Sequence, residues 1–316
     1  MADSPPSSAP AAPAPPAPAP VSKARTFARR LGSTLILWAV VLTAMFSGNR
    51  FLSDYVFLLL MLVLAVAGLL EFYGLVEKEG MVCFKGIGVF GGVLLMAGTF
   101  AKLQGMLGEF SSPARVNDLE TSFLILFVLG LCVRQFISRT NTKGILAIST
   151  TLFGLMYVPW LLNFIQKIQF FPGLDGNGKF YVLYFILVTK FSDTGAYAVG
   201  SLIGRHKMIP RISPGKTWEG FGGAIAVSTG ASLLFAHLAG PRLVGMTPLH
   251  AALLGVLLSS AAVVGDLIES IFKREAGVKD SGRFFPGIGG ILDLLDSLLF
   301  NAPLMYLYLR HVLTHP

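Results

Sequence analysis

The sequence predicts an all-α polytopic membrane protein, and three observations carry that prediction. Hydrophobic residues make up 53% of the 316 residues, charged residues only 13%, and the mean hydropathy is +0.68. Apolar runs long enough to cross a bilayer, which takes about 20 residues, recur along the chain. Backbone groups inside lipid must be hydrogen-bonded within their own segment, so we expect each run to be a helix.

We expect about nine transmembrane helices, at residues 31–47, 52–74, 84–101, 120–138, 144–166, 180–200, 217–239, 248–271 and 290–310. Residues 1–22 are almost all Ala, Pro and Ser, which cannot bury enough apolar surface to order, so they are predicted to be a disordered tail. The rest is one integral membrane domain. We divide it into N-terminal membrane helices, residues 23–179, and C-terminal helices with charged loops, residues 180–316.

Basic residues predict the orientation. A secretory signal begins with basic residues followed by an apolar stretch. Here the basic cluster of residues 23–30 follows the tail, so the first apolar run is predicted to stay as an anchor. With the N-terminus in the cytoplasm, most of the 25 Lys and Arg residues fall in cytoplasmic segments, as the positive-inside rule requires. The net charge of +8 follows from this topology and from anionic lipid headgroups, so we expect no nucleic-acid partner.

Three C-terminal runs carry ionisable residues, which are costly inside a membrane and are therefore candidates for function. In this orientation all of them lie toward the cytoplasmic side. They are Lys190 and Asp193, Asp266 and Glu269, and Asp293 and Asp296.

The spacing of these acids predicts that they meet. Asp293 and Asp296 are three residues apart, which puts them on one face of a helix. The eighth and ninth runs are antiparallel neighbours, so Asp266 is able to face Asp293. Carboxylates this close repel each other unless cations lie between them, and Mg²⁺ typically binds one or two carboxylates together with substrate phosphates.

The loop of residues 204–217 is rich in basic residues and has a Pro-Gly turn before the seventh helix. Its "GKT" is not a Walker A motif, because Pro210 stands where the first glycine is required, and we expect no strand upstream. Gly215 would let the backbone approach a ligand, and Lys216 offers a point charge to a phosphate. Thr217 is expected to open a helix whose N-terminal amides favour anions. A positive-inside loop explains these charges equally well, but it does not explain the glycines.

Residues 270–297, "SIFKREAGVKDSGRFFPGIGGILDLLDS", resemble the signature of phosphatidate cytidylyltransferases, also called CDP-diacylglycerol synthases. That signature runs Ser-x-x-Lys-Arg, Lys-Asp, Pro-Gly-His-Gly-Gly, Asp-Arg and a further Asp. "SDTGAY" (192–197) and "SPGKTWEGFGG" (213–223) are also similar to family motifs, in the family's order, so the likeness covers about residues 180–300. Two positions depart: Ile288 replaces the His, and Leu294 replaces the Arg.

The resemblance implies a nucleotidyltransferase of phospholipid synthesis, which transfers the cytidylyl group of CTP to phosphatidate and releases CDP-diacylglycerol and pyrophosphate. Both substrates are anions, so catalysis rests on positioning and charge neutralisation. Two Mg²⁺ ions are able to hold the attacking phosphate of phosphatidate and the pyrophosphate that leaves. It also implies a multi-pass protein of the cytoplasmic (inner) membrane, in contact with membrane lipid, and we allow for a homodimer.

The charged loops and the resemblance together assign the expected site residues. The metal ligands are Asp266, Asp293 and Asp296. The catalytic residues are Asp193, Lys216, Lys273, Arg274, Lys279, Asp280 and Asp296. The substrate-binding residues are Ser213, Gly215, Lys216, Thr217, Lys273, Arg274, Arg283, Gly289 and Gly290.

Lys279 and Arg283 are expected to supply the positive charge that the family's His and Arg give elsewhere. Three other interpretations remain open. The acids could form purely structural ion pairs with Lys190, Lys273 and Arg274. The protein could be a CTP-dependent lipid-alcohol kinase, or an ion-coupled transporter that uses the buried acids.

Overall fold

The computed structural model describes isolated positions between 39 and 46 and then residues 48–108, 113–138, 141–174, 176–282 and 289–314. The long helices are α2 (Arg50–Lys78), α3 (Lys85–Leu103), α4 (Pro113–Ile137), α5 (Gly144–Leu155), α6 (Leu161–Gln169), α7 (Gly178–Ile203), α8 (Trp218–Ala239), α9 (Pro248–Glu275) and α10 (Ile291–Tyr308). A π-helical segment, Met156–Trp160, joins α5 to α6, and a second π-helical segment, Leu309–Leu313, follows α10. Two short strands, β1 (Lys207–Ile209) and β2 (Ser213–Thr217), and a 3₁₀ turn, Gly240–Arg242, complete the described elements.

The helical membrane architecture predicted from the sequence is confirmed. Eight of the nine predicted runs are helices of the described chain; the first run, 31–47, lies almost wholly outside the described residues, as do the tail 1–22 and the basic cluster. Within the described ranges, seven helices are long and apolar enough to cross a membrane. Helix α7, which carries Lys190 and Asp193, is not among the seven.

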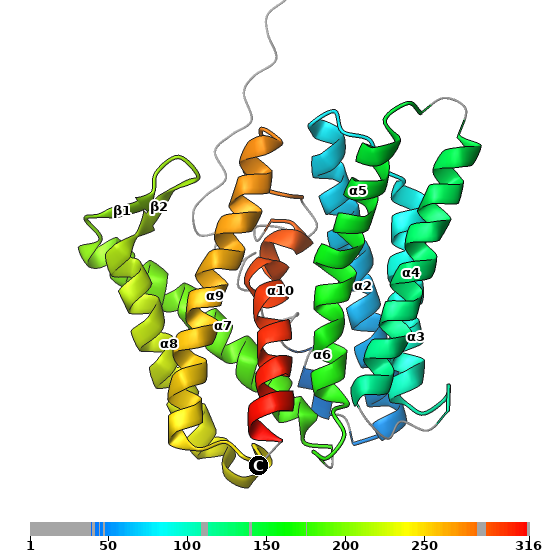
Figure 1. Cartoon of the computed structure of the whole chain (residues 1–316). Helices are drawn as coiled ribbons and strands as arrows, with labels where there is room; N and C mark the ends of the chain where they lie inside the picture. The colour runs from blue at the N-terminus through cyan, green and yellow to red at the C-terminus, as the bar shows by residue number, and fades with distance from the viewer. Residues whose placement is uncertain are drawn as a thin grey trace, which may run out of the picture.

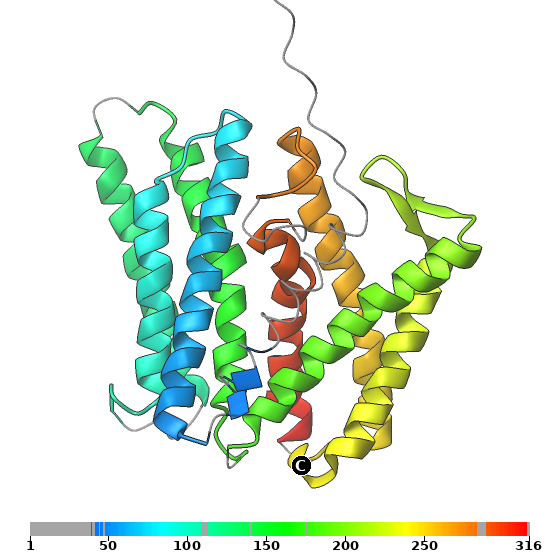
Figure 2. The same ribbon diagram turned by 180° about the vertical axis from the view of Figure 1, so that it is seen from behind.

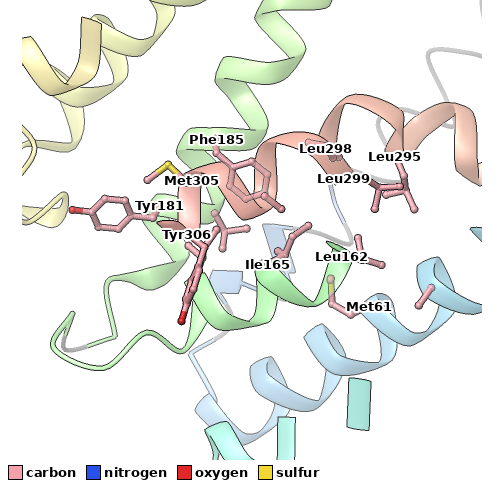
Figure 3. Packing of buried hydrophobic residues seen from close by; sticks show 14 of the residues in the cluster. Met61, Leu162, Ile165, Tyr181, Phe185, Leu295, Leu298, Leu299, Met305 and Tyr306 are labelled. Atoms are coloured by element: carbon pink, nitrogen blue, oxygen red, sulfur yellow. The ribbon is translucent and has the colours of Figure 1, made fainter. Parts of the chain in front are cut away.

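Helix α10 runs between two groups of helices, with α2 to α6 on one side and α8 and α9 on the other, while α7 crosses obliquely past α10 (Figures 1 and 2). Figure 3 shows Met61 of α2, Ile165 of α6 and Phe185 of α7 lying around Leu298 and Leu299 of α10. These side chains are buried, so the core of the molecule joins the N-terminal and C-terminal halves along α10.

The loops predicted to be cytoplasmic gather at one end of the molecule. Figure 1 shows the connections α2–α3, α4–α5 and α9–α10 and the β-hairpin at the same end, opposite the C-terminus. This grouping is what a chain that crosses the membrane back and forth requires. Which compartment that end faces stays a prediction.

The loop before α8 contains a β-hairpin, so the expectation of no strand upstream of the "GKT" was wrong. Strands β1 and β2 pair antiparallel, with Lys207 opposite Thr217 and Ile209 opposite Ser213. They have three and five residues, too short for the alternation that identifies strands in a sequence. Tertiary contacts fix the hairpin instead: the Glu219 carboxylate accepts hydrogen bonds from the N–H groups of Arg205 and His206.

Candidate functional site

Small residues bring α7 and α8 into close contact. A Cβ on Gly195 of α7 would lie 2.6 Å from the carbonyl oxygen of Gly223 in α8, and a Cβ on Gly223 would lie 2.9 Å from the carbonyl oxygen of Gly195. Membrane helices pack through such small residues because their backbones then approach closely. The crossing explains the glycine of "SDTGAY" and two of the three glycines of "WEGFGG", Gly220 and Gly223. It also sets Asp193 of α7 and Lys216 of β2 on the lining of one cavity.

A second close contact joins α9 to α10. A Cβ on Gly265 of α9 would lie 2.7 Å from the carbonyl oxygen of Asp296 in α10. Glycine at this position therefore lets the two antiparallel helices touch at the depth of the acids. As a result Asp266, the next residue of α9, lies beside Asp296.

A cavity of about 490 Å³ opens where these four helices and the β-hairpin meet. Its size is typical of small-molecule sites, which run from about 300 to 1,000 Å³. Among the described residues, six charged side chains line it: Lys190, Asp193, Lys216, Asp266, Asp293 and Asp296.

Three carboxylates in this region form a cluster suited to a cation. Asp266, Glu269 and Asp296 each offer one oxygen, and these oxygens lie within 4.8 Å of one another. Glu269 is fully buried, and its Oε1 atom has no hydrogen-bond partner among the described residues. Hard divalent cations prefer carboxylate oxygens, and a buried oxygen without a partner is costly. The donor set therefore fits Mg²⁺ or a similar ion.

Asp293, the third predicted ligand, is held by donors of the protein itself. Its Oδ1 atom lies 2.7 Å from Lys273 Nζ. Its Oδ2 atom accepts hydrogen bonds from the N–H groups of Ser281 at 3.1 Å and Gly290 at 2.8 Å. Asp293 lines the cavity, while its part in metal binding stays a prediction.

The acids also pair with lysines, as the structural interpretation predicted in part. Lys273 contacts Glu269 as well as Asp293. Lys216 Nζ lies 2.8 Å from Asp266 Oδ2, and Lys190 Nζ lies 3.4 Å from Asp193 Oδ2. These three lysines offset much of the negative charge of the site and hold the carboxylates in place.

Arg274 does not take part in those pairs among the described residues. Its guanidinium donates hydrogen bonds to the backbone carbonyls of Ile212, at 3.2 Å, and Val278, at 3.5 Å. It therefore ties the end of α9 to the β-hairpin.

The "SPGKT" strand forms one wall of the cavity, which includes Ser213, Gly215, Lys216 and Thr217. Gly215 has no atom within 4 Å of the place where a Cβ would stand, so a ligand has room beside its backbone. Thr217 caps α8, since its hydroxyl oxygen accepts a hydrogen bond from the Gly220 N–H at 3.1 Å. The predicted helix start at Thr217 is confirmed.

Other predicted residues lie apart from this cavity. Lys279 and Asp280 are exposed in the turn after α9, and neither belongs to the described lining. Gly289, with φ of 117°, and Gly290 directly precede α10. Arg283 and Ile288 fall outside the described residues.

Sequence reasoning left two acids unassigned. Glu269 was noted as an intramembrane charge without a role, although its spacing of three residues from Asp266 puts both on one face of α9. Glu71, in α2, was missed; its carboxylate accepts hydrogen bonds from Ser281 and Leu292. An acid inside the predicted apolar run 52–74 was the signal that would have found it.

Comparison with known proteins identifies the family. Residues 29–312 match the model of the cytidylyltransferase family. A phosphatidate cytidylyltransferase of Mycobacterium bovis is 37% identical over 57% of this chain and 58% of that protein. Those of Staphylococcus haemolyticus and Haemophilus influenzae are 34% and 28% identical, over 69% and 87% of this chain and 92% and 96% of theirs. The chain thus spans little more than half the length of the mycobacterial relative and nearly the full length of the other two. The chain belongs to the cytidylyltransferase family.

Proposed function

We propose that this protein is a nucleotidyltransferase that moves the cytidylyl group of CTP to phosphatidate, giving CDP-diacylglycerol and pyrophosphate. One observation carries the proposal: a cavity lined by four aspartates and two lysines in a helical membrane protein of the cytidylyltransferase family. The relatives named above as phosphatidate cytidylyltransferases support the choice of substrates.

The reaction needs little covalent help from the protein. A phosphate oxygen of phosphatidate forms a bond to the α-phosphorus of CTP while the bond from that phosphorus to the bridging oxygen of the β-phosphate breaks. Pyrophosphate leaves with the bonding electrons. Both reactants are anions, so the protein must align them and offset their charge.

The residues of the site divide this task. Asp266, Glu269 and Asp296 would hold a Mg²⁺ ion, which supplies positive charge for the phosphate oxygens when bound. Lys216 is only partly buried, with 21% of its side chain exposed, so it is able to turn from Asp266 to a phosphate. Lys190 is the second cation of the cavity and is 32% exposed. The second metal ion remains a prediction.

The position of the cavity suits a lipid and a nucleotide together. It lies toward the end of the helices that carries the β-hairpin (Figure 1). In the predicted orientation that end faces the cytoplasm, where CTP is found, and a lipid phosphate lies at the same depth in the headgroup region. We therefore place the protein in the cytoplasmic membrane; assembly as a homodimer stays a prediction.

CTP labelled separately at its α- and γ-phosphates tests the proposal with the purified full chain and phosphatidate in mixed micelles. The α-label should enter lipid and the γ-label should leave as pyrophosphate, and Asp296→Asn should stop both. Asp118→Asn, which alters an exposed acid of α4, is the matched control. Transfer of the γ-label to a lipid alcohol would identify a kinase. Ion-coupled uptake by protein vesicles without CTP, with no lipid product, would identify a transporter.

A further inference from the structure

The residue before helix α10, which carries Asp293 and Asp296, has no capping side chain, although Asp293 itself accepts a hydrogen bond from the N–H of that residue. Its first residue is Ile291, and the residue before it is Gly290. The first N–H groups of a helix have no partner within the helix, and a Ser, Thr, Asp or Asn side chain just before it usually accepts one of them. Glycine has no such group.

A carboxylate from the other half of the chain takes this role. Glu71 Oε2 accepts a hydrogen bond from the Leu292 N–H at 2.9 Å, and Leu292 is the second residue of α10. Two hundred and twenty-one positions separate the two residues along the chain. Glu71 lies on α2, so the cap of α10 joins the N-terminal helices to the helix that carries the acids.

The same carboxylate also contacts Ser281, which lies at the α9 end of the connection between α9 and α10. Ser281 Oγ lies 3.1 Å from Glu71 Oε2 and 2.9 Å from Asp293 Oδ2. One hydroxyl thus lies between the α2 acid and the first acid of α10. This places Glu71 beside both ends of the segment that runs from Ser281 to α10.

Two glycines make room for Glu71. A Cβ on Gly282 would overlap Glu71 Oε1, and a Cβ on Gly290 would overlap Glu71 Oε2. Glycine at both positions therefore has a steric reason: Glu71 approaches Gly282 closely, and Glu71, the Ser281 hydroxyl and the Gly282 backbone nitrogen approach Gly290. Neither glycine has a positive φ, so backbone conformation does not explain them.

We propose that Glu71 is a positioning residue: its carboxylate caps α10 from α2 and fixes the first turn of α10, and with it Asp293 and Asp296, against α9. The catalytic part of this inference rests on the proposed function; the cap does not. An acceptor oxygen at the right reach is what the cap requires, so glutamine should replace glutamate and alanine should not.

Hydrogen exchange read by mass spectrometry tests the cap without substrate or metal. In the full chain, Glu71→Ala should speed exchange in the first turn of α10 by about tenfold, the scale of a lost helix cap. Glu71→Gln should stay near wild type. Glu77→Gln is the control, because Glu77 is an exposed acid of α2 that pairs with Lys85. Exchange in α3 reports whether each variant is folded.

Turnover tests the consequence. Glu71→Ala should lower kcat by about 10- to 100-fold, as small misplacements of catalytic groups do, with KM for CTP changed less than about threefold, since Lys216 and the β-hairpin are untouched. Unchanged exchange at the first turn of α10 in Glu71→Ala would overturn the cap. Equal losses of kcat in Glu71→Gln and Glu71→Ala would show that turnover depends on the negative charge of Glu71 and not on its hydrogen-bond acceptor. That result would overturn the positioning role. A wild-type chain without transferase activity would instead refute the proposed function, and exchange alone would then decide the cap.

Discussion

Lys273→Met probes the most buried charges of the site. The Lys273 side chain is 13% exposed, and its Nζ lies 2.7 Å from Asp293 Oδ1. It also contacts the carboxylate of Glu269, which is fully buried. Methionine has a similar length and no charge, so the substitution leaves two carboxylates without their cation while changing the packing little.

The expected loss is large because the pair is buried. Removing one partner of a buried ion pair costs about 3–5 kcal/mol, whereas an exposed pair contributes about 0–1 kcal/mol. The chain offers an exposed pair for comparison: Lys85 Nζ lies 3.1 Å from Glu77 Oε2, with side chains 38% and 51% exposed. Lys273→Met should therefore lower the free energy of unfolding several times more than Lys85→Met.

Unfolding in mixed detergent with increasing dodecyl sulfate measures both variants under one condition. Adding Glu269→Gln to Lys273→Met should restore part of the lost stability, since it removes the buried carboxylate that the lysine had balanced. Equal stability of Lys273→Met and Lys85→Met would refute the argument. So would a double variant less stable than Lys273→Met alone.

Three further predictions follow from the same geometry. Lys216→Met should lower kcat/KM by about 10- to 150-fold, the scale of a hydrogen bond to a charged group. It should change the free energy of unfolding by less than about 1 kcal/mol, because the ion pair of Lys216 is partly exposed. A larger change in stability than in activity, both expressed as free energies, would contradict this prediction. Asp293→Asn should abolish turnover in protein that still inserts and folds, and near-normal activity at millimolar Mg²⁺ would exclude Asp293 from the site. Lys279→Cys, in a chain without Cys83 and Cys132, should react with an impermeant thiol reagent only when the cytoplasmic face is open, and labelling from outside would invert the topology.

The sequence was informative about the helices because membrane spans are a local property. Runs of about 20 apolar residues predict a helix wherever they occur, and the described helices follow these runs. The β-hairpin was missed because its strands, of three and five residues, depend on contacts with Glu219 and the end of α7 rather than on their own pattern.

For the site, antiparallel order predicted that acids of α9 and α10 lie close together, but not which ones: Asp266 was expected to face Asp293, whereas the described cluster joins it to Glu269 and Asp296. It was not enough to predict partners that come from distant helices. Glu71 reaches α10 from α2, and Lys279 is exposed although it stands in the middle of the signature. Such contacts are decided by tertiary packing, which one sequence does not encode in its local pattern.

The central claim is that acids of α9 and α10 form one divalent-cation site at the cavity. Mn²⁺ titration followed by electron paramagnetic resonance, on the purified chain without substrates, tests it most directly. Asp296→Asn should weaken Mn²⁺ binding by more than about tenfold, since loss of even an outer partner of a metal site costs that much, and Asp118→Asn should leave binding unchanged. Equal Mn²⁺ affinity in wild type and Asp296→Asn would contradict the claim.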